Sequence, residues 1–97
     1  MASYTVPAGE IGVHETLVAS TADSVTFTDD ITEVEVLNRD GAAEIYFTVD
    51  GSTPTVGGEN CRVLPAAIGG LELRVEHGDV VKLISSGTPT YSVSVVQ

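Results

Sequence analysis

Histidine and cysteine residues are few in this sequence and widely spaced. His14 lies beside Glu15, His77 lies close to Asp79, and Cys61 is the single cysteine. Nucleophilic catalysis needs a base within hydrogen-bond reach of the nucleophile and a third group that orients the base. Neither histidine belongs to a motif such as G-x-S-x-G, so both are expected to be exposed polar residues, and Cys61 a small buried one. The sequence therefore predicts no catalytic residue and no enzymatic activity.

Metal or phosphate binding would have to rest on the acidic residues and on the glycines. The two histidines and one cysteine form no zinc motif. Calcium prefers carboxylate and carbonyl oxygens from loops, and acids gather at two places: Asp23, Asp29, Asp30 and Glu33, and then Asp50 and Glu59. These acids lack the D-x-[DN]-x-[DN]-G spacing, and Gly57-Gly58 lacks the Lys and Ser/Thr of a P-loop. We expect no metal and no cofactor, with a calcium-binding loop as the open alternative.

The order of residue types favours strands over helices. Valine, threonine and isoleucine make up 31 of the 97 residues, and β-branched side chains suit a pleated sheet better than a helix. Apolar and polar residues alternate in several runs, which is typical of strands with one buried face. The alternation predicts strands at about 13–19, 24–28, 31–38, 43–49, 60–65, 71–76 and 80–85, and a last one through Tyr91, Val93 and Val95.

Turn signals separate the predicted strands. Asp40-Gly41 between 31–38 and 43–49 favours a hairpin turn, and 76–79 and 86–89 predict two more hairpins. The spacing indicates an all-β fold, a single-domain antiparallel β-sandwich or small barrel of seven to eight short strands. We expect an extended N-terminal arm at 1–11, a β domain at 12–97 and one long irregular loop at Asp50–Asn60. Alternation cannot separate a sandwich from a barrel.

The net charge of the chain disfavours two classes of binding partner. Fourteen acidic residues against four basic ones give a formal charge of −10, which disfavours nucleic acid and anionic membranes as partners. The sequence shows no secretory signal and no apolar run that could cross a bilayer. Hydroxyl side chains at predicted outward positions add a polar surface: Thr26, Thr28, Thr48, Ser92 and Ser94. The composition is therefore that of a β module that works by docking.

The second half of the chain resembles a known family. The segments EIYFTVDGSTPTVGGENCRVLPA from Glu44 and VVKLISSGTPTYSVSVV from Val80 are similar to small virion proteins of tailed bacteriophages. The resemblance covers about residues 44–97 and implies a non-enzymatic capsid decoration protein on the outer surface of the head, made in the host cytoplasm. It implies the major capsid protein as partner and a homo-oligomer, with a trimer as the favoured form.

Under this hypothesis the contacts lie in the N-terminal arm and the long loop. The expected interface residues are Tyr4, Val6, Pro7, Ser52, Thr53, Pro54, Thr55 and Val56. The alternative is a tail or head-fibre module that binds host-surface carbohydrate, although the chain has no tryptophan to stack on a sugar. Placement on head or tail, the copy number and the oligomeric state stay open.

Overall fold

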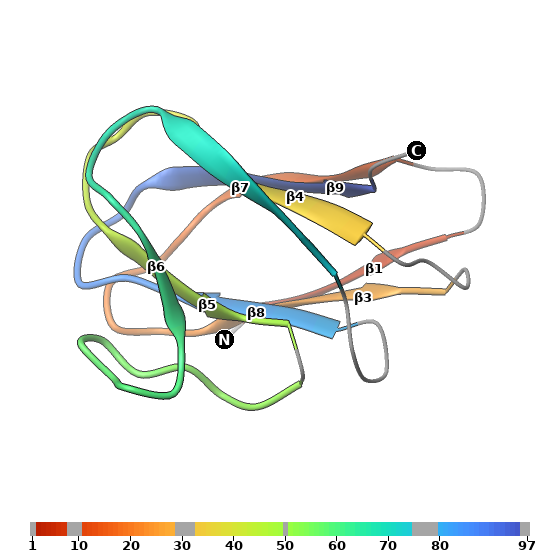
Figure 1. The fold of residues 1–97 in the computed structure, drawn as a ribbon, viewed down its shortest axis with the longest axis horizontal. Coiled ribbons are helices and arrows are strands. Elements are labelled where there is room, and N and C mark those ends of the chain that lie inside the picture. Colours follow the sequence, from red (N-terminus) through yellow and green to blue (C-terminus); the bar gives the residue numbers. More distant parts are fainter. Residues whose placement is uncertain (1, 8–10, 29–32, 50, 75–79, 96–97) are drawn as a thin grey trace.

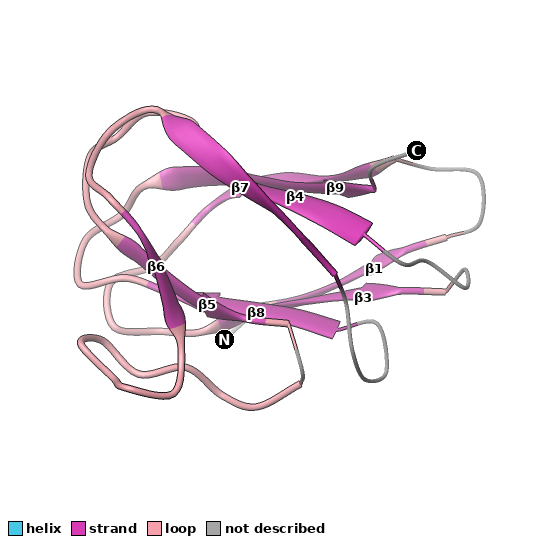
Figure 2. Ribbon diagram, in the orientation of Figure 1, coloured by secondary structure: helices cyan, strands magenta, loops and turns pink. Residues whose placement is uncertain are grey.

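The fold is built from strands that follow the predicted alternation. The computed structural model describes residues 2–7, 11–28, 33–49, 51–74 and 80–95, and these contain strands and loops but no helix (Figure 2). Nine strands occur in the described residues: β1 (Ser3–Val6), β2 (Gly12–Thr16), β3 (Asp23–Phe27), β4 (Glu33–Asn38), β5 (Ile45–Thr48), β6 (Arg62–Leu64), β7 (Gly69–Arg74), β8 (Val80–Ile84) and β9 (Thr90–Val95).

The strands form two sheets that pack face to face. One sheet has the order β1-β3-β8-β5-β6, and the other has the order β2-β9-β4-β7 (Figure 1). The inward side chains of both sheets share one core, in which Val25, Val36 and Phe47 have no exposed surface. The predicted all-β class is confirmed, and burial alternates with a period of two in β3, β4 and β8 but not in β2 or β6.

The three predicted hairpins are wrong, because consecutive strands lie in opposite sheets. β4 and β5, which flank Asp40-Gly41, belong to different sheets, as do β7 and β8, and β8 and β9. The turn residues 76–79 themselves lie outside the described residues. Within the described residues the chain stays in one sheet only from β5 to β6. Period-two alternation marks which face of a strand is buried but not which strand it pairs with, and both sheets face the same core.

Polar contacts fix the crossing after β4. The buried Asn38 side chain donates to the carbonyls of Ala43 and Pro65 at 2.9 Å and accepts from the Gly41 amide at 3.0 Å. Gly41 has a φ of 66°, a left-handed conformation that suits glycine. The Arg39 amide donates to the Thr90 carbonyl at 2.8 Å. The end of β4 is thereby held against β9, and the Asp-Gly turn carries the chain across to the other sheet.

The N-terminal segment also differs from the expected arm. Residues 3–6 form β1, which pairs with β3 in parallel, and Val6 lies in the core. This parallel pair departs from the expected antiparallel sheet. The chain leaves β1, runs through β2 in the opposite sheet and returns as β3, so β1 and β3 point the same way. A four-residue strand ending before Pro7 gives too short an alternation to be recognised.

Candidate functional site

The β5–β6 loop has its own internal hydrogen bonds. The Thr48 hydroxyl donates to the Ser52 carbonyl at 2.5 Å, and the Gly58 amide donates to the Thr55 carbonyl at 2.9 Å. The Cys61 thiol donates to the carbonyls of Thr55 and Gly58 at 3.5 and 3.4 Å. Cys61 is partly exposed and not buried as expected, because it belongs to the end of the loop, directly before β6. These contacts fix the shape of the loop between the two strands.

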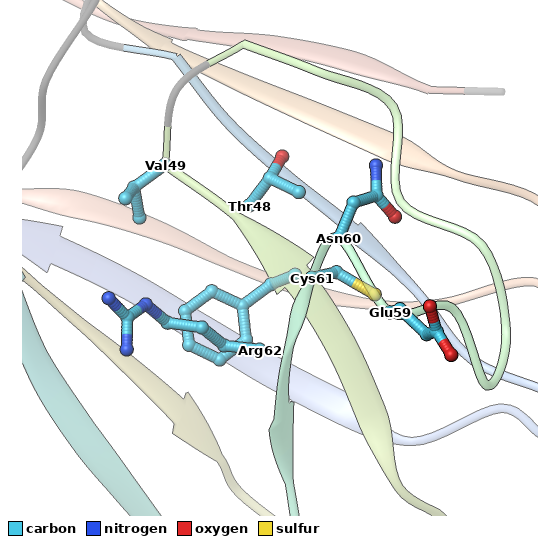
Figure 3. Close-up of a pocket in the computed structure, with 7 residues that line it drawn as sticks. Thr48, Val49, Glu59, Asn60, Cys61 and Arg62 are labelled. Atoms are coloured by element: carbon cyan, nitrogen blue, oxygen red, sulfur yellow. The ribbon is translucent and has the colours of Figure 1, made fainter.

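An open pocket of about 300 Å³ lies at the base of this loop. Its lining joins the end of β5 to the start of β6: Phe47, Thr48, Val49, Glu59, Asn60, Cys61 and Arg62 (Figure 3). Figure 3 shows the Glu59 carboxylate and the Arg62 guanidinium pointing to opposite sides of the strand. The sequence did not indicate this pocket, because its wall forms only when β5 and β6 pair.

The expected interface residues fall into two separate groups. Tyr4 and Val6 lie on β1, whereas Ser52 to Val56 follow β5, and β3 and β8 separate the two strands in the sheet. Val6 and Pro54 are buried and contribute no exposed surface. Tyr4 and Ser52 are half-buried, and the exposed members are Pro7, Thr53, Thr55 and Val56. The structure therefore places the expected interface residues on two separate surfaces, neither of which is complete.

A serine–histidine contact joins two neighbouring strands. His14 on β2 is exposed, as expected, and its Nδ1 lies 2.7 Å from the Ser92 hydroxyl on β9. Ser92 faces away from the core, as predicted, because its neighbours Tyr91 and Val93 point into the core. It is nevertheless buried, and His14 is its partner in the strand register. This contact is not part of the pocket at the β5–β6 loop, because the strands that line the pocket belong to the other sheet. His77 lies outside the described residues.

The acidic residues that were candidates for calcium do not gather in the described part of the chain. No group of three or more His, Cys, Asp or Glu side chains there could hold a metal ion. Asp23 is buried and accepts a hydrogen bond from the Tyr91 hydroxyl, so it belongs to the core. Glu33 and Glu59 are exposed, while Asp29, Asp30 and Asp50 lie outside the described residues.

Large apolar side chains are exposed along both flanks of the sandwich. On one flank, where β6 lies against β7, Val63, Ile68 and Leu71 are 46%, 75% and 42% exposed. On the other flank β1 lies against β2, and Ile11, directly before β2, is 69% exposed. Thr48 faces away from the core, as predicted, but it is buried because the β5–β6 loop covers it. No sequence pattern indicates the exposed flanks, because exposure at a sheet edge depends on strand order.

Comparisons with protein-family models, with curated proteins and with solved structures find no match to this chain. Among the described residues no helix is long and apolar enough to span a membrane.

Proposed function

We propose that this chain is a non-enzymatic structural protein of a tailed-bacteriophage particle, an outer capsid decoration protein that docks on the head shell and stabilises it. Its partner in this proposal is the major capsid protein of the same particle, and it acts as a homo-oligomer, with a trimer favoured. The proposal starts from the resemblance of residues 44–97 to such proteins.

The observation that carries the proposal is the apolar surface of an otherwise acidic body. Ile11, Ile68 and Val63 are large apolar residues with much of their surface in solvent, in a chain with a net charge of −10. Large apolar side chains left in solvent at sheet edges are typical of contacts with another protein. In this proposal they serve the homo-oligomer, and the β5–β6 loop serves the contact with the capsid. The negative charge favours a position outside the shell, because packaged DNA would repel an acidic protein.

The loop between β5 and β6 supplies a second element of the proposal. Its exposed tip carries Thr53, Thr55 and Val56, and hydrogen bonds within the loop favour this ordered shape. A pre-ordered loop loses less conformational entropy on docking than a flexible one. We assign this loop to the contact with the capsid surface.

Removing the protein from the particle tests the proposed function. Binding that favours the assembled shell over free capsid subunits stabilises the shell by mass action. Heads that lack the protein are expected to open at a lower temperature, and adding the purified chain is expected to restore the native value. Heads of unchanged thermal stability, with the purified chain failing to sediment with them, would contradict the proposal.

The pocket at the β5–β6 loop favours one second candidate, a fibre module that binds host carbohydrate. Glu59, Asn60 and Arg62 line it and offer hydrogen-bond donors and acceptors of the kind that sugar hydroxyls need. The Phe47 ring, however, is fully buried and offers no stacking face. A glycan array tests this candidate. Binding that is lost in Arg62→Ala supports it, and signal no higher than background contradicts it.

A further inference from the structure

The two flanks of the sandwich differ in charge. Strands β6 and β7 contain two of the four basic residues of the chain, Arg62 and Arg74, against one acid, Glu72. Strands β1 and β2 contain Glu15 and no lysine or arginine. The strands of one flank thus carry a formal charge of +1 and those of the other −1, and both flanks expose large apolar residues.

The flanks are also open edges of both sheets. In the described strand order β6 and β7 end the two sheets on one side, and β1 and β2 end them on the other. An edge strand presents backbone groups that can pair with another strand. β7 is antiparallel to β4, β4 to β9, and β9 to β2, so β7 and β2 run in opposite directions. By the same reasoning β6 and β1 run in opposite directions.

Strand direction decides how copies of the chain can join. If a second copy is related by rotation about an axis parallel to the strands, its β1 and β2 lie antiparallel to β6 and β7 of the first copy. Both sheets can then continue across the contact, with the flank that carries Arg62 against the flank that carries Glu15. A two-fold contact of the β6–β7 flank with itself would instead bring two positive flanks together and leave Ile11 in solvent.

We infer that the chain associates with itself head to tail, with the β6–β7 flank of one copy docked on the β1–β2 flank of the next. The occupant of each flank is a second copy of this chain. Such a heterologous contact closes into a ring when the rotation between copies is an integral fraction of a full turn. The inference rests on the homo-oligomer in the proposed function and deepens it, because it assigns the contact that forms it.

Charge reversal on each flank tests the inference. Arg62→Glu and Glu15→Arg change exposed side chains, so both variants should fold. Each variant alone places like charges across the contact, so we expect association to weaken more than about tenfold. Sedimentation velocity should then show the mass of the monomer, near 10.1 kDa. The double variant Arg62→Glu with Glu15→Arg restores opposite charges at every contact, whatever the number of copies in the ring, and should recover the native mass. Arg39→Glu, an exposed arginine in the β4–β5 connection, is the matched control and should associate normally.

Three results would overturn the head-to-tail contact: a native chain that is monomeric at all concentrations, an Arg62→Glu variant that dissociates while Glu15→Arg does not, or a double variant that stays monomeric. Sedimentation of the same proteins with phage heads keeps the two proposals apart. A monomeric native chain that still binds heads removes this inference and the homo-oligomer of the proposed function, and leaves the docking on the capsid intact. An oligomer that behaves as described but does not sediment with heads supports this inference and contradicts the docking on the capsid.

Discussion

The Tyr91 hydroxyl donates a hydrogen bond of 2.9 Å to Oδ2 of Asp23, and both residues are buried between the two sheets. Tyr91 belongs to β9 in one sheet and Asp23 to β3 in the other. This polar link joins the two sheets across a largely apolar core. All buried side-chain nitrogen and oxygen atoms in the described residues have a hydrogen-bond partner.

Removing the tyrosine hydroxyl should destabilise the fold. Tyr91→Phe keeps the ring but leaves the buried Asp23 carboxyl group without its donor, at a cost of about 2–3 kcal/mol. Urea unfolding followed by circular dichroism measures this cost. Asp23→Asn retains an acceptor oxygen and is the matched control, with a smaller expected loss. Equal stability of Tyr91→Phe and the native chain would show that the link between the sheets contributes nothing.

Alkaline pH should weaken the fold through the same residue. Burial, and then the nearby charge of Asp23, raise the pKa of Tyr91 far above its ordinary value of 10.0. Above pH 10 the tyrosine ionises in the unfolded chain but stays protonated in the folded one. Release of the proton therefore stabilises the unfolded state relative to the folded state. The stability present below pH 10 is therefore lost as pH rises, by up to about 1.4 kcal/mol per pH unit from this group.

Unfolding free energies measured between pH 8 and 11.5 test this dependence. Tyr91→Phe lacks the ionising group, so its stability should fall less steeply over the same range. Tyr4 and Tyr46 also have raised pKa values, from partial burial in the first case and chiefly from the Glu44 hydrogen bond in the second, and they remain in both proteins. Parallel curves for the native chain and the variant would contradict the assignment to Tyr91.

The stability of the connection from β4 to β5 should depend on the buried side-chain amide of Asn38. Asn38→Ala removes two donated hydrogen bonds and one accepted bond from a side chain with no exposed surface, and we expect a loss of about 2–4 kcal/mol. Gly41→Ala should cost about 1–2 kcal/mol, because a φ of 66° disfavours a side chain there. Ala42→Ser, at an exposed neighbouring position, is the control. If Asn38→Ala unfolds at the same temperature as the native chain, the side-chain hydrogen bonds of Asn38 do not stabilise the connection between β4 and β5.

Local patterns predicted the strands well and their partners poorly. Val25, Phe27, Ile45 and Phe47 are buried at the positions that alternation indicated, because a strand on a core must bury every second side chain. Pairing depends instead on contacts between residues far apart in sequence, such as Arg39 with Thr90 and Asn38 with Pro65. An Asp-Gly turn looks the same whether it joins neighbours in one sheet or crosses to the other.

The candidate site was predictable only in part. The loop around Pro54 was recognisable from its glycines and its length, but its closure by the Cys61 thiol was not. The exposure of Val63 and Ile68 follows from the place of β6 and β7 at the sheet edges. Val6, expected at an interface, is buried because β1 adds to a sheet through a parallel pairing that short-range patterns do not reveal.

The tip of the β5–β6 loop should affect docking without affecting the fold. Val56 is 42% exposed, so Val56→Glu should leave the unfolding free energy within about 0.5 kcal/mol of the native value. The same change places a charge in the proposed contact with the capsid, and we expect binding to heads to weaken about tenfold or more. Val18→Glu, at an exposed apolar residue before β3, is the matched control. If Val56→Glu binds heads as well as the native chain while Val18→Glu loses binding, the contact with the capsid does not lie in this loop.

The most direct test of the proposed function is the position of the protein in an electron-microscopy map of the intact particle. We expect density that fits this two-sheet body at regular sites on the outside of the head, with the β5–β6 loop facing the capsid surface. Density confined to the tail, or particles that contain no copy of the chain, would contradict the assignment as a capsid decoration protein.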